Sequence, residues 1–138
     1  MDNKTVVRRF LEEVGSTGDL DRIPEFIAPQ CRPSDSPAGP VDGIAAMRAH
    51  LLGVRTTFPD LQLRVEQQIA EGEWVATRVT AEGTHLGGWL GMKPTGKRVT
   101  ITAVDLDRVV DGRIVEHGGA ANMLEALLAI GALSVCPD

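Results

Sequence analysis

Asp105 is the residue whose type and position point most directly to chemistry. In the expected strand 99–110, alternation places Asp105 on the same face as Ile101 and Ala103, which predicts an interior position. A buried carboxylate costs free energy unless it is hydrogen-bonded, and burial raises its pKa. A carboxyl group of raised pKa suits a general acid or a donor to a developing oxyanion. A register change that turns Asp105 outwards, or an ion pair with a neighbouring arginine, would remove that role.

Two further charged residues could complete an acid–base site. Arg78 lies in the expected strand 74–84, and we expect it to point into the same pocket and bind a carbonyl or acidic group. Asp35 lies in the proline-rich segment 29–42, which we expect to be a loop or a poorly hydrogen-bonded edge and to form part of the pocket rim. Each has an ordinary alternative. Arg78 could be a solvated strand arginine, and Asp35 could bond its own turn backbone.

The histidines and the glycine-rich segment 86–98 supply the remaining polar and apolar candidates. His85 ends a strand and is expected at the pocket edge, whereas His117 is expected to be buried and hydrogen-bonded. The chain has three histidines without HxH or HxxxH spacing, so we expect no metal site. We interpret the run Gly-Gly-Trp-Leu-Gly at 87–91, within that segment, as a mobile flap in which Trp89 and Leu90 cover the pocket.

The periodicity of the chain predicts the elements that must position these residues. Helical apolar spacing covers 6–14, 20–27 and 43–57, and Asp19 and Asp42 are expected to cap the second and third helices. Four strands are expected next, at 61–66, 74–84, 99–110 and 113–121, and a short helix at 123–130 closes the chain. Asp111-Gly112 is the expected hairpin turn between the last two strands. Helices followed by an antiparallel meander predict an α+β fold. We expect one domain, 1–138, whose curved antiparallel sheet wraps around the N-terminal helices as a cone with an internal pocket.

The charge balance and the cysteine content of the chain limit the classes of molecule that it is expected to bind. The 138 residues carry 14 basic and 19 acidic side chains, a formal net charge of −5, which disfavours nucleic acid and anionic membrane surfaces. No signal sequence and no apolar run of membrane-spanning length is visible. The two cysteines, Cys31 and Cys136, have no metal-site spacing and are expected to be reduced thiols of a cytoplasmic protein. No nucleotide-binding glycine motif or nucleophile elbow is present.

Four short motifs resemble those of the SnoaL-like polyketide cyclases, which belong to the nuclear-transport-factor-like superfamily. They are Phe58-Pro59-Asp60, Gly83-Thr84-His85, Pro94-Thr95-Gly96-Lys97 and the run from Asp111 to His117. The resemblance spans about residues 5–133. It implies a curved α+β cone, a homodimer formed through the open sheet face, and ring closure of a polyketide ester by intramolecular aldol condensation without metal or cofactor.

The chain departs from the cyclase pattern at the family's acid–base carboxylate. The resemblance places that carboxylate five residues after His117, where this sequence has Asn122, and an amide cannot exchange a proton as a carboxylate does. Steroid isomerases and pyran synthases of this fold instead resemble the chain in a pair of acids at Asp35 and Asp105. Limonene epoxide hydrolases match at Arg78 but not at Thr80, which stands where their first aspartate would be.

We therefore expect a cofactor-free cyclase or isomerase that acts on an apolar, polyketide-like intermediate in natural-product biosynthesis. Asp105 is the expected acid and Asp35 the expected base. Arg78, His85 and Asn122 would orient a carbonyl, and the expected substrate contacts also include Trp89 and His117. Two alternatives stay open: a non-catalytic small-molecule binder or accessory protein, and a cofactor-free hydroxylase.

Overall fold

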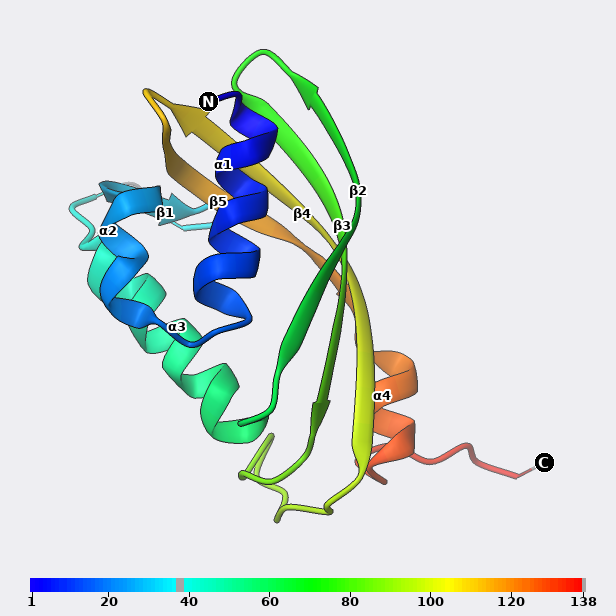
Figure 1. The fold of residues 1–138 in the computed structure, drawn as a ribbon. Coiled ribbons are helices and arrows are strands. Elements are labelled where there is room, and N and C mark those ends of the chain that lie inside the picture. Colours follow the sequence, from blue (N-terminus) through cyan, green and yellow to red (C-terminus); the bar gives the residue numbers. More distant parts are fainter. Residues whose placement is uncertain (37–38, 138) are drawn as a thin grey trace.

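A curved five-stranded sheet wraps around the N-terminal helices (Figure 1). The computed structural model describes residues 1–36 and 39–137. Pro37 and Ala38, part of the segment expected to be a loop or a poorly hydrogen-bonded edge, lie outside the described residues, as does Asp138. The helices are α1 (Asn3–Phe10), α2 (Ile23–Phe26), α3 (Gly43–Thr57) and α4 (Leu124–Ala129). The strands are β1 (Ile27–Pro33), β2 (Gln62–Glu71), β3 (Trp74–Thr84), β4 (Arg98–Val110) and β5 (Arg113–Asn122).

The sheet has the order β1-β5-β4-β3-β2, and four of its strands form the expected antiparallel meander. The fifth strand, β1, corresponds to the edge alternative for segment 29–42, although it begins two residues earlier, at Ile27. It pairs in parallel with β5 at the sheet edge, although the sequence there is rich in proline. Proline is tolerated at a sheet edge because one side of such a strand needs no partner for its N–H groups. Segment 29–42 is therefore an edge strand up to Pro33, and the sheet is mixed.

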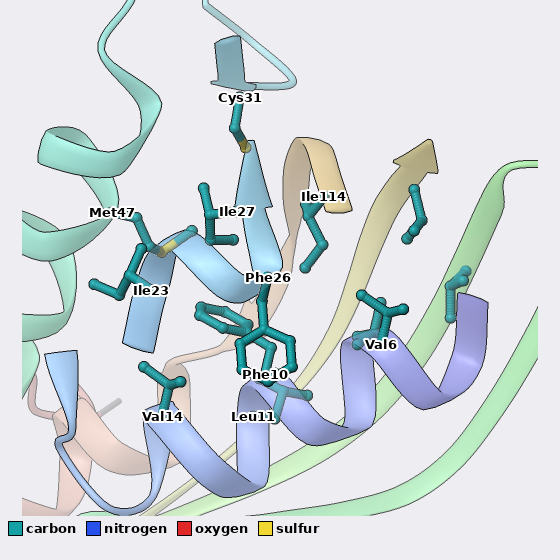
Figure 2. Close-up of a cluster of buried hydrophobic side chains, with 13 residues drawn as sticks. Val6, Phe10, Leu11, Val14, Ile23, Phe26, Ile27, Cys31, Met47 and Ile114 are labelled. Carbon is teal, nitrogen blue, oxygen red and sulfur yellow. The ribbon is translucent and has the colours of Figure 1, made fainter. Parts of the chain in front are cut away.

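The main hydrophobic core lies between α1 and the sheet (Figure 2). Helix α1 continues into a π-helical turn, η1 (Leu11–Gly15), which carries the expected apolar stripe to the fully buried Val14. The expected second helix is shorter than its pattern suggests. It consists of a 3-10 turn, η2 (Leu20–Arg22), and the four residues of α2. Asp19 precedes η2, but its side chain makes no capping hydrogen bond.

Helix α3 forms the wall that faces the sheet across the candidate site. The expected cap is confirmed, because the Asp42 carboxylate accepts a hydrogen bond from the backbone N–H of Ala45 at 3.0 Å. At the other end of α3, the carbonyl of Thr57 accepts hydrogen bonds from the N–H groups of Leu86 and Gly87. An added Cβ at Gly87 would lie 2.0 Å from the Thr56 carbonyl oxygen, so only glycine permits this close approach.

The hairpin between β4 and β5 sets the register of the candidate site. Asp111 and Gly112 have φ values of 50° and 77°, the left-handed conformations of the expected two-residue turn. Val110 then pairs with Arg113 and Val109 with Ile114, but a bulge follows between Arg108 and Val109. Beyond the bulge Asp107 lies opposite His117. One extra residue in β5 thus decides which side chains meet inside the cone.

Candidate active site

Two adjoining chambers lie between α3 and the inner face of the sheet. The β1 chamber, of about 400 Å³, is bounded by β1, the first half of α3 and the end of β5. The flap chamber, of about 620 Å³, extends to Phe58, Trp89 and the inner faces of β3 and β4. Six residues line both chambers and form the junction: Met47, His50, Ala103, Asp105, His117 and Ala121. The ionisable groups of the junction stand in an otherwise mostly apolar lining.

Asp105 lies on the inner face of β4, as the alternation predicts, and lines both chambers. It is opposite Thr77 on β3 and Gly119 on β5. Burial raises the pKa of Asp105 from an ordinary 3.8 to about 6, while the positive charge of His117 lowers it and the negative charge of Asp107 raises it further. The register change that would turn Asp105 to solvent does not occur. Asp105 is therefore a carboxyl group at the cavity surface that gains or loses a proton near neutral pH.

His117 and Asp107 form a buried pair beside Asp105. Asp107 is 2% exposed, and its Oδ1 lies 2.5 Å from Nδ1 of His117. Since a carboxylate can only accept, Nδ1–H of His117 is the donor, which fixes the orientation of the ring. Burial lowers the pKa of His117, but the hydrogen bond and charge of Asp107, together with the charge of Asp105, outweigh burial, and the net change raises it. Asp107 thus stabilises a protonated imidazole at the junction.

Sequence reasoning missed Asp107. Its position two residues after Asp105 puts both carboxylates on one face of β4, and that signal was available. The sequence does not reveal that His117 is the partner of Asp107. A regular hairpin with its turn at Asp111-Gly112 would place Glu116 opposite Asp107, and only the bulge brings His117 there. His117 is hydrogen-bonded, as expected, but it also lines both chambers.

The small residues 118–121 leave room for the backbone and side chain of Asp105 on the neighbouring strand. Gly119 has φ +147°, and a Cβ there would lie 2.4 Å from the carbonyl oxygen of Val104 and 2.8 Å from Cα of Asp105. All four residues from Gly118 to Ala121 line the β1 chamber. The segment therefore widens the cavity beside Asp105, as expected of a strand that accommodates a bulky molecule.

Four of the expected site residues line neither chamber: Asp35, Arg78 and Asn122, which are exposed, and His85. Asp35 is exposed in the turn after β1, so the structure does not bring it to Asp105. The expectation that Arg78 points into the pocket is wrong. Val75, Thr77 and Val79 face the interior, which turns the exposed Arg78 to the outer face. Asn122 is exposed at the end of β5, opposite the outward Thr102.

His85 and Trp89 lie at the base of the flap and have different roles. Trp89 lines the flap chamber, whereas Leu90 is 65% exposed and does not cover it. His85 is completely buried beside the rings of Phe58 and Trp89. Its Nδ1 accepts from the backbone N–H of Thr95 at 3.3 Å and lies 3.0 Å from the Thr95 hydroxyl. His85 thus anchors the flap and does not line either chamber.

The geometry supplies one carboxylate and one oriented imidazolium to a single apolar space. Among the described residues, no group of three or more His, Cys, Asp or Glu side chains could hold a metal ion. None of the described helices is long and apolar enough to cross a membrane. The arrangement suits the transfer of protons to and from a small molecule at the junction.

The sequence and the fold match those of a known family. The family model of the SnoaL-like polyketide cyclases matches residues 5–130, and the chain belongs to that family. It is 37% identical over 105 residues to nogalonic acid methyl ester cyclase of Streptomyces nogalater, covering 74% of this chain and 78% of that one. It is 31% identical to aklanonic acid methyl ester cyclase DnrD of Streptomyces peucetius, covering 81% of this chain and 79% of that one.

A solved structure extends the comparison. AclR of Streptomyces galilaeus, described as a "putative hydroxylase", superposes with a TM-score of 0.81 at 33% identity and covers 98% of this chain and 84% of its own. The family resemblance and the cone-shaped α+β fold predicted from the sequence are thereby confirmed.

The raised pKa of Asp105 predicts that this carboxylate lowers stability at neutral pH. The native state holds the proton up to about pH 6, whereas the unfolded chain releases it near pH 4. The free energy of unfolding therefore falls as the pH rises from about 4 to 6, by up to about 3 kcal/mol. We expect Asp105→Asn to match the wild type at pH 4 and to exceed its stability at pH 7.5. Urea unfolding at both pH values measures this, and equal stability at pH 7.5 would contradict the burial of the charge.

Proposed function

We propose that this protein closes a ring in an apolar, polyketide-like intermediate by acid–base catalysis at the junction. The observation that carries the proposal is the placement of Asp105 and the His117–Asp107 pair side by side on the junction wall. Near neutral pH the Asp105 carboxylate is mostly ionised, and His117 has a raised pKa. The wall then holds a base and an acid at the same time.

Ring closure uses these two groups in turn. The Asp105 carboxylate takes a proton from a carbon next to a substrate carbonyl, which leaves an enolate. The enolate carbon attacks a second carbonyl carbon of the same molecule. A carbon–carbon bond forms, and the electron pair of that C=O group moves to its oxygen. The His117 imidazolium gives its proton to the resulting alkoxide, and a later proton exchange with water restores both groups. Asp107 keeps the imidazole oriented throughout.

This assignment changes the roles expected from the sequence. Asp105 acts as the base, and His117, expected to be a buried, hydrogen-bonded residue and a substrate contact, acts as the acid. Asp35, Arg78 and Asn122 have no part in the proposed step because they lie outside the chambers. The family carboxylate that Asn122 replaces is thus compensated from β4.

The test uses the substrates named for the two relatives. We expect purified protein to convert nogalonic acid methyl ester or aklanonic acid methyl ester into a product of unchanged mass, because an aldol closure rearranges atoms without loss. Asp105→Asn should lower the rate by about 10²-fold or more while the fold is retained. Leu52→Ala, at an exposed position of α3, is the matched control.

Liquid chromatography with mass detection follows the reaction. Binding of both esters without conversion would overturn the proposal in favour of a small-molecule binder. Undiminished turnover by Asp105→Asn would overturn the role of Asp105.

A cofactor-free hydroxylase is the second candidate, and the 33% identity to AclR favours it. Hydroxylation would add one atom of dioxygen to the product and release the other as water, with the two electrons and two protons for that water taken from the substrate itself. The same assay, repeated under argon, separates the two reactions. A heavier product that disappears without oxygen would select the hydroxylase.

We also propose that the protein is a homodimer formed through the outer face of the sheet. Val104 and Leu106 are 49% and 45% exposed there, beside Ala76. Exposed apolar side chains grouped on one face favour a partner surface. Light scattering should give twice the chain mass for the wild type and a lower mass for Leu106→Glu. A wild-type monomer at micromolar concentration would contradict the dimer.

A further inference from the structure

His50 is a polar side chain of the cavity that the proposed ring closure does not use. It lies on α3 and lines both chambers at the junction, across the space from the strand residues Asp105 and His117. The α3 residues that line the chambers are otherwise apolar or glycine, except Thr57. The Thr57 hydroxyl is already engaged with the carbonyl oxygens of Gly53 and Gly88. His50 is therefore the one described α3 side chain with an uncommitted N–H at the cavity.

The imidazole of His50 has no hydrogen-bond partner or ion pair within the described part of the chain. The neighbouring ionisable groups at the chambers are Asp105 and His117 on the strands and Cys31 and Arg32 on β1. The His50 side chain is exposed, so in the free protein its N–H can contact solvent. A molecule that fills the junction displaces that solvent, and the N–H then needs a polar partner on the molecule. A substrate oxygen at the junction is such a partner.

The charge state of His50 suits a donor that does not become a competing acid. Burial and the positive charge of His117 both lower the pKa of His50. His50 is thus neutral under conditions in which His117 is protonated. A neutral imidazole still carries one N–H, and such a group can polarise a carbonyl oxygen without transferring its proton.

We propose that His50 contacts the substrate from the helical wall and donates a hydrogen bond to the oxygen that carries the enolate charge. This inference rests on the proposed ring closure. In that reaction, Asp105 removes the proton from the strand side and the negative charge develops on the adjacent carbonyl oxygen. A donor on the opposite wall stabilises that charge, while His117 stays free to protonate the alkoxide. His50 is accordingly a catalytic residue that transfers no proton.

Paired substitutions test the donor role. His50→Leu keeps much of the side-chain volume and removes the N–H, and it should lower kcat on the ester substrate by about 10²-fold. His50→Gln keeps an N–H donor and should retain activity within about tenfold of the wild type. KM should change far less than kcat in both variants, because the bond strengthens only as the enolate forms. Leu52→Gln, two residues along α3 and exposed, is the control and should behave as the wild type.

A second measurement needs no substrate. Nuclear magnetic resonance titration should show His50 with a pKa below that of an ordinary histidine, and His117→Gln should raise it. Removal of the His117 charge has this effect only if the two rings face the same space. An unchanged His50 titration in His117→Gln would overturn the facing geometry.

The kinetic outcomes separate this inference from the proposed function. If Asp105→Asn abolishes ring closure and His50→Leu does not, the proposed function stands and the donor role is wrong. If His50→Gln is as slow as His50→Leu, restoring an N–H donor does not restore the rate, and the donor role proposed for His50 is wrong. If Asp105→Asn turns over normally, the ring-closure mechanism itself fails.

Discussion

The hydrogen bond between buried Asp107 and His117 is the interaction on which the site depends. A carboxylate that is 2% exposed needs a charged or donating partner, and the bulge in the β4–β5 ladder supplies one by bringing His117 opposite. The bond orients the imidazole, raises its pKa and leaves Asp105 as the second carboxylate on the same face. Without the bulge, the hairpin would pair Asp107 with Glu116 and place two acids side by side.

The remainder of the fold forms the apolar cavity that surrounds Asp105 and the Asp107–His117 pair. The curved sheet and α3 flank two mostly apolar chambers, so a molecule bound there would lie against apolar walls and close to the ionisable groups of the junction. The small residues from Gly118 to Ala121 allow the close approach of Asp105, and Thr57 holds the first residues of the flap against the end of α3. The buried carboxylate lowers stability at neutral pH, which is a common consequence of an active-site charge.

Much of this architecture follows from the sequence, and the exceptions have physical reasons. Apolar spacing predicts α1, α3 and the meander, and alternation correctly places Asp105 inside. For β1 the sequence leaves a loop and a sheet edge open, because its prolines disfavour a strand unless the strand lies at an edge, and local sequence does not reveal the edge. Arg78 was misplaced because the neighbouring Trp74 suggests an inner face, whereas Val75 and Val79 occupy it. The Asp107–His117 pair depends on a bulge, and pattern alone does not locate one.

The pH dependence of kcat/KM for ring closure, measured for the wild type and for Asp107→Asn, tests the central claim most directly. A bell-shaped profile is predicted, with an acidic limb near pH 6 from Asp105 and an alkaline limb from His117. The alkaline limb should move to lower pH in Asp107→Asn, because the imidazolium loses its carboxylate partner. A profile without an acidic limb, or an alkaline limb that Asp107→Asn leaves unmoved, would contradict the account.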